Sequence, residues 1–511
     1  MKKVYNIIIY VFVVATLTSC FKDLGNYDYT DKEVISITGI QESYTAIQLV
    51  DKLNITPTVT SNKPAEFEYY YALYETNVQG YAPVMDTIQK TGKDIVNYLI
   101  TKKAMTYGLV FMAKNKKTGV TGFFKSTLNV VTKFNNGWYV IKNEGEVCDL
   151  DLFDATNNKI ENVLLAINGK QLKGSAACLT VANNYKAYDV GTGRFVNTTT
   201  LFPVTDKDAM AVILSTAKIE HGFGDMFYEE VSGPFAPGIF MATFQGLWTT
   251  NHGRAFGIYG MSANSGKFGV EFPIDINYTP YYLSKYSVFH GSNGPLSFDE
   301  TSSTFVIVPP FGTSLIPAKN QSVTEMSAVN NNKTILYMAS RSLFDTYFFA
   351  VMKDKTNPNV RFISKVEGFN SSSSISLKIT NDTLATSDLA FNANMYTSNH
   401  SLDIMYFVSG GKIYMRNVAA KRTTNVDLGI SIPAGETVSF IKHIPKVTAT
   451  TFNYFVVGTT ISGNYKVRMY NVKSTGDVET TPALLLEGKG RAGDVLFTFP
   501  TISHSTFPAS F

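Results

Sequence analysis

The stretch from residue 245 to residue 259 holds the side chains best suited to recognising a ligand. Trp248 and Tyr259 could provide flat stacking faces, and polar residues between them could form hydrogen bonds in a loop loosened by glycine. These polar residues are Asn251, His252 and Arg254. Aromatic faces with a few polar groups suit sugars and peptides equally. For Trp248 itself, packing in a hydrophobic core is the favoured interpretation.

A cysteine near the N-terminus is placed where a lipid could be attached. Two lysines precede an apolar run from Val4 to Leu17, and Thr18-Ser19-Cys20 follows. A basic start, a short apolar core and small residues are typical of a secretory signal peptide. The ending resembles a bacterial lipobox, which implies cleavage before Cys20 and a lipid on its thiol. An ordinary signal peptide with a chance cysteine is the alternative.

The residues behind Cys20 indicate where the protein is anchored. Residues 20–32 are polar and rich in Gly, Asn, Tyr and Asp, which predicts a lipidated tether after a signal peptide over residues 1–19. Phe21-Lys22-Asp23 resembles the signal that exports Bacteroidetes lipoproteins to the cell surface. We therefore expect a lipid-anchored protein of the outer membrane that faces the cell exterior, with the periplasmic leaflet as the alternative.

The other residues that could do chemistry form no recognisable catalytic or metal-binding motif. The six histidines lack H-E-x-x-H spacing, and neither a G-x-S-x-G elbow nor a P-loop occurs. Asp149, Asp151 and Asp154 could suggest calcium, but alternation along a strand accounts for the first two. We predict no metal, no cofactor and no enzymatic activity. A pair of glycosidase carboxylates spread over distant segments is the alternative, because sequence cannot locate such a pair.

Composition limits the partners and leaves one disulfide open. Charged residues make up 17% of the chain and the net charge is +4, with no Lys/Arg-rich run, so nucleic acid is not an expected partner. Cys148 and Cys178 remain after Cys20. An exported protein can oxidise such a pair to a disulfide, and two buried free thiols are the alternative.

Residues 33–134 have the pattern of a β-sandwich. Short alternating runs separated by turn signals, such as Leu53–Thr60 and Phe67–Tyr74, predict an immunoglobulin-like domain of about 100 residues. A buried strand at Leu109–Ala113 and another at Thr127–Val131 fit the same pattern. The apolar spacing of Asp94–Ile100 instead predicts a short inserted helix.

Residues 135–511 consist of longer β-units that repeat loosely. Tyr406–Val418 and Tyr454–Val472 both contain an aromatic strand, a glycine turn, an alternating strand and an Asn-Val exit. Their separation is close to the roughly 40–50 residues of a propeller blade, which predicts about seven or eight blades in this region. A weaker echo covers Ile335–Met352. The prediction is therefore an all-β protein, a sandwich followed by a β-propeller, with two or three stacked sandwiches as the alternative to the propeller.

Several segments resemble the PKD-like lipoproteins of Bacteroidetes. They are the tether Leu24–Tyr29, Ile35–Ile40, Ile55–Val59, the aromatic strand Phe67–Tyr71 and Gly137–Ile141. The resemblance implies a surface lipoprotein that accompanies a Sus-like nutrient importer, formed by a TonB-dependent channel and its lidding lipoprotein. It brings no catalytic residues with it.

Three functions remain open from the sequence. The first is a non-enzymatic lipoprotein that binds an oligomeric nutrient, either peptide or glycan, for the importer. The second is a lipoprotein hydrolase with an active site spread over propeller blades. The third is a purely structural subunit of the importer complex.

Overall fold

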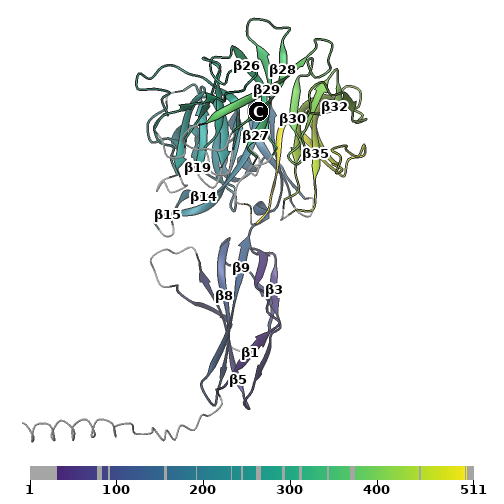
Figure 1. The fold of residues 1–511 in the computed structure, drawn as a ribbon. Coiled ribbons are helices and arrows are strands. Elements are labelled where there is room, and N and C mark those ends of the chain that lie inside the picture. Colours follow the sequence, from purple (N-terminus) through teal and green to yellow (C-terminus); the bar gives the residue numbers. More distant parts are fainter. Residues whose placement is uncertain are drawn as a thin grey trace, which may run out of the picture.

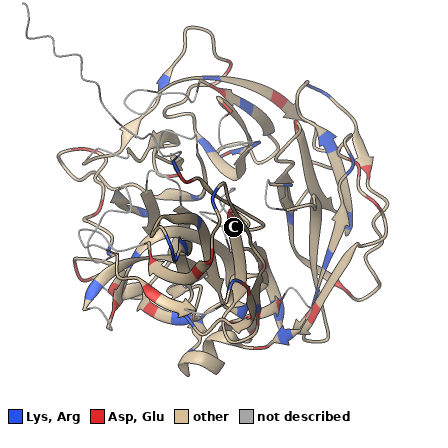
Figure 2. Cartoon of the chain, turned by 90° about the horizontal axis from the view of Figure 1, so that it is seen from below, with Lys and Arg blue, Asp and Glu red and all other residues tan. Residues whose placement is uncertain are grey.

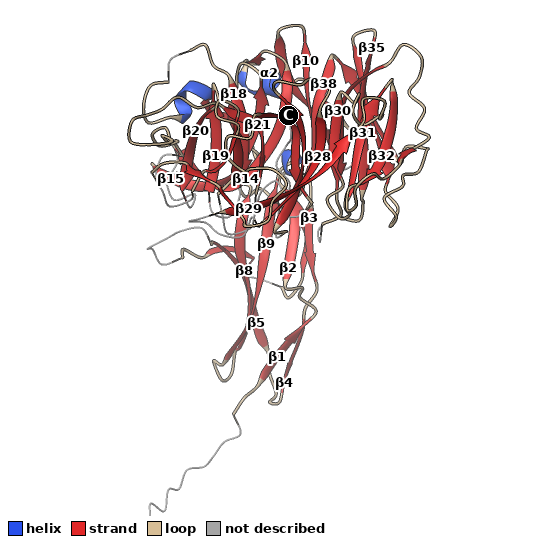
Figure 3. Cartoon of the chain, turned by 45° about the horizontal axis from the view of Figure 1, so that its top comes forward, coloured by secondary structure: helices blue, strands red, loops and turns tan. Residues whose placement is uncertain are grey.

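The structure is a computed structural model with two groups of strands, an elongated one and a broad one (Figure 1). Helices are few and short among the described residues (Figure 3), and no helix of these residues has the length and apolar character needed to cross a membrane. The all-β class is thus confirmed. The described residues are 32–76, 83–89, 92–154, 158–190, 193–231, 233–242, 246–259, 266–289, 294–309, 313–341, 345–368, 375–447, 450–500 and 502. The predicted signal peptide, Cys20 and nearly all of the tether lie outside them.

The elongated group is a sandwich of one large sheet and two strand pairs. The large sheet has the order β2 (Ser43–Ile47), β9 (Thr121–Val131), β8 (Met105–Asn115), β5 (Phe67–Glu75), β6 (Asp86–Gln89). The pairs are β1 (Ile35–Thr38) with β4 (Thr58–Ser61) and β3 (Lys52–Ile55) with β7 (Ile95–Leu99). Leu53 and Ile95 from the pairs meet Tyr71 and Phe111 from the large sheet in one core.

The helix predicted over Asp94–Ile100 is wrong, because this segment forms strand β7. Ile95 is buried and pairs with Ile55, while Asn97 takes a positive φ of 54° and its N–H donates to Asn54 Oδ1 at 2.7 Å. A short apolar run cannot be assigned to helix or strand by periodicity alone. The partner strand β3, distant in sequence, decided the outcome.

The broad group contains seven sheets among the described residues. Each is named here after the strand at one end of its order that contacts the corresponding strands of the neighbouring sheets, and this strand is called its first strand whatever its place in the chain. The β38 sheet has β38 (Arg491–Thr498), β10 (Gly137–Glu144), β11 (Val147–Asp154) and β12 (Lys159–Ile160), with β13 (Leu172–Lys173) on β11. The β14 sheet has β14 (Ala176–Asp189), β15 (Arg194–Thr205), β16 (Met210–Ile213) and β17 (Lys218–Gly222). The β18 sheet has β18 (Pro237–Ala242), β19 (Gly246–Asn251) and β20 (Arg254–Tyr259).

The other four sheets follow in chain order. The β21 sheet has β21 (Leu283–Val288), β22 (Leu296–Asp299), β23 (Thr304–Ile307) and β24 (Ile316–Pro317). The β26 sheet has β26 (Lys333–Ser340), β27 (Tyr347–Asp354), β28 (Arg361–Glu367) and β29 (Ser376–Leu384), with β25 (Lys319–Asn320) at its edge. The β30 sheet has β30 (Met395–Ser398), β31 (Ile404–Ser409), β32 (Lys412–Asn417) and β33 (Asn425–Asp427). The β34 sheet has β34 (Thr437–Ile444), β35 (Tyr454–Ile461), β36 (Asn464–Asn471) and β37 (Leu484–Lys489).

These sheets resemble propeller blades in strand order and in how they contact one another. The first strands touch in succession, β14 with β18, β18 with β21, β21 with β26, β26 with β30, β30 with β34 and β34 with β38. β38, the last strand, contacts β14 and pairs with β10, the earliest strand of the group. Hydrophobic clusters fill the spaces between neighbouring sheets. Among the described residues, no sheet contains strands from both the sandwich and the broad group.

The sequence repeat corresponds to the second and third strands of two adjacent sheets. Tyr406–Val418 covers most of β31 and β32, and Tyr454–Val472 covers β35 and β36. The weaker echo at Ile335–Met352 covers β26 and β27, which are a first and a second strand. That echo is therefore out of register with the blade-like unit and reflects only a general hairpin pattern.

A short 3-10 helix, η1 (Lys133–Asn135), joins the two groups and is packed against the broad one. The Thr132 hydroxyl donates to the Ser215 carbonyl at 2.6 Å, and the Phe134 carbonyl accepts the Tyr139 hydroxyl at 2.9 Å. Phe134 is buried in a core with Leu150 and Leu201. The linker is thus part of the packed structure of the broad group.

Candidate functional site

The predicted recognition loop is a tight hairpin turn, and its tryptophan is a core residue. Trp248 lies in β19 with only 3% of its surface exposed, in a cluster with Ala255, Tyr281 and Leu283. Gly257 on the neighbouring strand leaves room for the indole, since an added Cβ there would lie 3.1 Å from the ring. The proposed stacking role of Trp248 is therefore corrected: its flat faces are covered by protein.

The polar residues of that segment are also occupied within the protein. The Arg254 Nε donates to Glu271 Oε1 at 2.8 Å, and its guanidinium lies 3.9 Å from the Tyr281 ring centroid. Asn251 is buried and its Oδ1 accepts the Ala236 N–H at 2.9 Å. His252 occupies the turn with a φ of 49° and contacts the Pro234 carbonyl.

The last residue of the predicted set adds nothing to a ligand site. Tyr259 ends β20, paired with Gly246, and its side chain is outside the described part of the structure. The core role of Trp248, which the sequence favoured, is the one that holds. Hairpin pairing between β19 and β20 turned the expected loop into two strands.

The disulfide considered between Cys148 and Cys178 is absent, and both are free, buried thiols. Cys148 on β11 packs in a cluster with Leu150, whereas Cys178 on β14 packs in a different cluster with Phe202. Burial raises the pKa of both thiols. Two side chains committed to separate cores cannot meet, so spacing in the sequence gave no guide to their pairing.

The carboxylates considered for calcium have structural partners. Asp149 accepts the N–H groups of Leu164 and Leu165 at 2.8 and 3.1 Å, which places it at the start of α2 (Val163–Asn168). Asp151 accepts the Tyr465 hydroxyl at 2.7 Å and so links the β38 and β34 sheets. Within the described residues no group of three or more potential metal ligands occurs.

A cavity of about 540 Å³ lies where the beginnings of six first strands converge. Its position on the molecule follows from β38, whose first residue Arg491 pairs with Asn143, while Thr498 at its other end pairs with Gly137 beside the linker. The cavity is therefore at the end of the broad group remote from the sandwich. The lining side chains include Ser175, Thr250, Tyr282, Lys285, Tyr286, Asn394, Tyr396, Ser439, Phe440 and Arg491.

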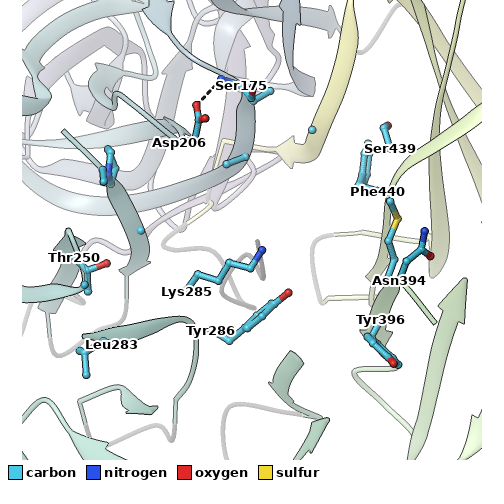
Figure 4. Close-up of a pocket in the computed structure, with 18 of the residues that line it drawn as sticks. Ser175, Asp206, Thr250, Leu283, Lys285, Tyr286, Asn394, Tyr396, Ser439 and Phe440 are labelled. Atoms are coloured by element: carbon cyan, nitrogen blue, oxygen red, sulfur yellow. Dashed lines mark hydrogen bonds between the residues drawn. The ribbon is translucent and has the colours of Figure 1, made fainter. Parts of the chain in front are cut away.

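Aromatic and polar groups face each other across this cavity (Figure 4). Lys285 and Tyr286 extend from β21 toward the side that carries Asn394, Tyr396 and Phe440. Tyr286 is part of an aromatic row, with its ring centroid 5.6 Å from that of Tyr337, which lies 6.2 Å from that of Tyr396. A volume of this size with aromatic walls and a few polar groups is typical of a ligand site.

The turn that the sequence singled out borders the cavity through other residues. Thr250 and Gly253 line it, and Tyr282 packs over Gly253, where an added Cβ would lie 2.7 Å from the Tyr282 ring. Gly253 has a φ of 70°, which favours glycine. The predicted segment was thus near the cavity, but the side chains chosen from it point elsewhere.

A second cavity of about 490 Å³ lies between the sandwich and the broad group. Thr106 and Asn129 line it from the sandwich, and Asn183, Asn197 and Thr198 line it from β14 and β15. Its walls carry no ionisable side chain among the residues that border it. It is less aromatic than the first cavity, so the first is the better candidate site.

Charge over the described residues gives no competing site. Basic and acidic residues are interspersed along the strands and loops of the ribbon rather than gathered into one stripe (Figure 2). Most of the shorter ion pairs join exposed or half-buried groups within or between sheets, such as Lys421 with Glu325 at 2.7 Å. This distribution fits the small net charge of the sequence.

Comparison with known proteins supports one part of the chain. Residues 20–176 match the PKD-like family. This match contains the sandwich and continues through β13 of the β38 sheet. The resemblance noted in the sequence is confirmed for this PKD-like region, and no curated protein matches the chain.

Solved structures of similar shape have low sequence identity. A quinonprotein alcohol dehydrogenase-like protein of Bacteroides thetaiotaomicron is 14% identical, with a TM-score of 0.39 over 90% of this chain and 97% of that one. PorZ, a surface component of the type-IX secretion system of Porphyromonas gingivalis, is 9% identical, with a TM-score of 0.30. The match covers 76% of this chain and 50% of PorZ. A DUF4784 family protein of Bacteroides caccae is 7% identical, with a TM-score of 0.29. The match covers 76% of this chain and 95% of that protein.

The cavity residues were missed by sequence reasoning because they share no local motif. Lys285, Asn394 and Arg491 come from three sheets that are far apart in the chain. Their common feature is position, since each lies at or beside the beginning of a first strand. An assignment of the first strand in every blade-like unit is the one signal that could have located them.

Proposed function

We propose that this protein is a lipid-anchored binding protein on the outer face of the outer membrane, which captures an oligomeric nutrient for a TonB-dependent, Sus-like importer. The seven blade-like sheets form a closed propeller in this proposal, and the sandwich raises it above the lipid on Cys20. The ligand is a peptide or a glycan, and the protein binds it without catalysis. The sequence features behind Cys20 and the PKD-like match of residues 20–176 support this proposal.

The cavity at the remote end of the broad group is the observation that carries the proposal. It combines aromatic walls with hydroxyl, amide and cationic groups, which is the composition expected of a site for a polar oligomer. Its position away from the sandwich would leave it open to the exterior when the N-terminus is held at the membrane. A ligand captured there would be presented on the side opposite the anchor.

Titration of the purified protein with oligosaccharides and oligopeptides tests the binding role. Asn394 is exposed in the cavity, so Asn394→Trp should fill part of the space and abolish saturable binding measured by calorimetry. Lys319→Trp is the matched control, because Lys319 is exposed on β25 and does not line the cavity. Unchanged affinity of a folded Asn394→Trp protein would place the site elsewhere, and appearance of cleavage products would favour the hydrolase.

Membrane fractionation tests the anchor. Cys20→Ala should move the protein from the membrane to the soluble fraction, because a lipid on this thiol would be its strong membrane contact. Retention of the variant in salt-washed membranes would show that something other than the lipid holds it. Co-purification tests the partner: the importer should be recovered with the parent protein from the membrane, and less of it with the Cys20→Ala variant.

A further inference from the structure

The cavity contains two cations and one carboxylate, and the carboxylate does not neutralise them. Lys285 on β21 and Arg491 on β38 both line the cavity, together with Asp206 in the turn after β15. Among the described residues, neither cation forms an ion pair with an acidic side chain. The Asp206 Oδ1 instead accepts the Ser175 N–H at 2.6 Å, as Figure 4 shows.

Lys285 is the more informative of the two cations. Its ammonium lies 5.3 Å from the centroid of the Tyr286 ring, an arrangement in which the ring face attracts positive charge. The side chain is exposed within the cavity, yet the surrounding protein is sufficient to lower its pKa by desolvation, with no acidic group acting against this effect. A cation in such a place is stabilised when a ligand brings a negative charge.

Arg491 provides a second positive group at another wall. Its Nη2 donates to the Ser439 carbonyl at 3.2 Å, which leaves other N–H groups of the guanidinium for a ligand. Apart from Asp206, the remaining polar lining is neutral, from hydroxyl and amide groups such as Thr250 and Asn394. The exposed Tyr282 and the half-buried Phe440 complete the wall, whereas Tyr286 is largely buried in the core behind it.

We propose that the cavity binds a glycan that carries carboxylate groups, with Lys285 pairing with a sugar carboxylate and Arg491 holding a second one. This inference rests on the proposed binding function and names its ligand class. Neutral hydroxyl and amide groups match the hydroxyls of a sugar, and the aromatic faces match its apolar ring face. A flexible acidic peptide would use the cations but would leave these aromatic and hydroxyl groups with less to contact, so the glycan is favoured.

Calorimetry on the intact protein separates the contributions of charge and sugar. The probes are an oligogalacturonate of about four to six units, the same oligomer with its carboxylates methyl-esterified, and an oligoglutamate of similar length. We expect the oligogalacturonate to bind, its affinity to fall as salt is raised, and the ester to bind roughly tenfold to hundredfold more weakly.

Substitutions assign the charge to the cavity. Lys285→Met keeps the length of the side chain and should weaken oligogalacturonate binding roughly tenfold or more, whereas Lys285→Arg should retain most of it. Lys52→Ala is the control, because Lys52 is exposed on β3 of the sandwich. Circular dichroism and melting of each variant check that the fold is unchanged.

The outcomes distinguish this inference from the proposed function. Equal binding of the acid and its ester would overturn the carboxylate and leave a neutral glycan-binding protein. Binding of oligoglutamate but not of oligogalacturonate would replace the glycan with an acidic peptide. If both acidic probes fail while a neutral oligosaccharide binds, the ligand class is wrong, and if no oligomer binds, the proposed function itself fails.

Discussion

At the scale of single residues, Trp248 shows how burial decides between two interpretations of one residue type. The indole has chemistry suited to ligand stacking, yet only 3% of the residue's surface is exposed. Trp248→Ala should lower the free energy of unfolding by about 3–5 kcal/mol, because truncation leaves a cavity in the core. Chemical denaturation measures this loss.

The ligand affinity of the folded Trp248→Ala protein should stay within about twofold of the parent value if the cavity holds the ligand. A selective loss of affinity with unchanged stability would return Trp248 to the site. Thr45→Ala is the control, because Thr45 is exposed on β2 of the sandwich, and it should change neither the stability nor the affinity.

Two histidines between the β30 and β34 sheets, the buried His443 and the half-buried His400, make stability depend on pH. The backbone N–H of His400 donates to His443 Nδ1 at 2.8 Å, and His443 Nε2 contacts Asn453 Oδ1 at 2.9 Å. Burial lowers the pKa of His400 to about 3, with the neighbouring His443 adding to the effect, and burial lowers that of His443 to about 4. Both rings are therefore neutral in the folded protein over most of the acidic range.

The sign of the effect follows from proton uptake by the unfolded chain. Below the ordinary histidine pKa of about 6.5 the unfolded state binds protons that the folded state does not, so stability is lost as pH falls from about 6.5 toward 4. The melting temperature should decline over pH 6.5–5, where most carboxylates titrate little. His443→Asn should make this decline shallower, and a slope identical to that of the parent would contradict the assignment.

At the scale of elements, Asp149 fixes the short helix α2 to strand β11. Its carboxylate accepts three backbone N–H groups, those of Leu150, Leu164 and Leu165. Burial raises the pKa of Asp149, and these hydrogen bonds oppose the shift. The helix has no side-chain cap from Asn162, so this carboxylate takes the place of one.

Asp149→Asn should destabilise the protein by roughly 1–3 kcal/mol, since an amide has one acceptor oxygen where the carboxylate has two. The midpoint of urea denaturation measures the change. Asp427→Asn is the control, because Asp427 is exposed on β33, and it should shift the midpoint much less. A calcium role for Asp149 would appear instead as stabilisation of the parent by added calcium, which we do not expect.

At the scale of the whole molecule, the junction between the sandwich and the broad group decides what can fold alone. Phe134 lies in the core of the broad group although it precedes β10. A chain that begins at Thr132 should therefore fold without the sandwich, and one that begins at Gly137 should melt at a lower temperature because it lacks this side chain. Scanning calorimetry of the two chains compares them, and equal melting temperatures would show that the linker adds no stability.

The sequence determined the features that depend on local pattern. Alternation and turn signals were enough to predict an all-β chain, strands such as β5, and a blade-like unit at β31–β32 and β35–β36, because strand periodicity is local. The PKD-like resemblance also came from short segments near the N-terminus. The N-terminal lipid on Cys20 was predicted in the same way and stays a prediction.

Only the tertiary structure decided which side chains meet. β7 became a strand because β3 pairs with it, and Trp248 became a core residue because two neighbouring strands cover it. Cys148 and Cys178 stay apart because their side chains pack in different cores. The cavity exists only because the beginnings of six first strands converge, so Lys285 and Arg491 line one cavity from different walls, which no local stretch of sequence could reveal.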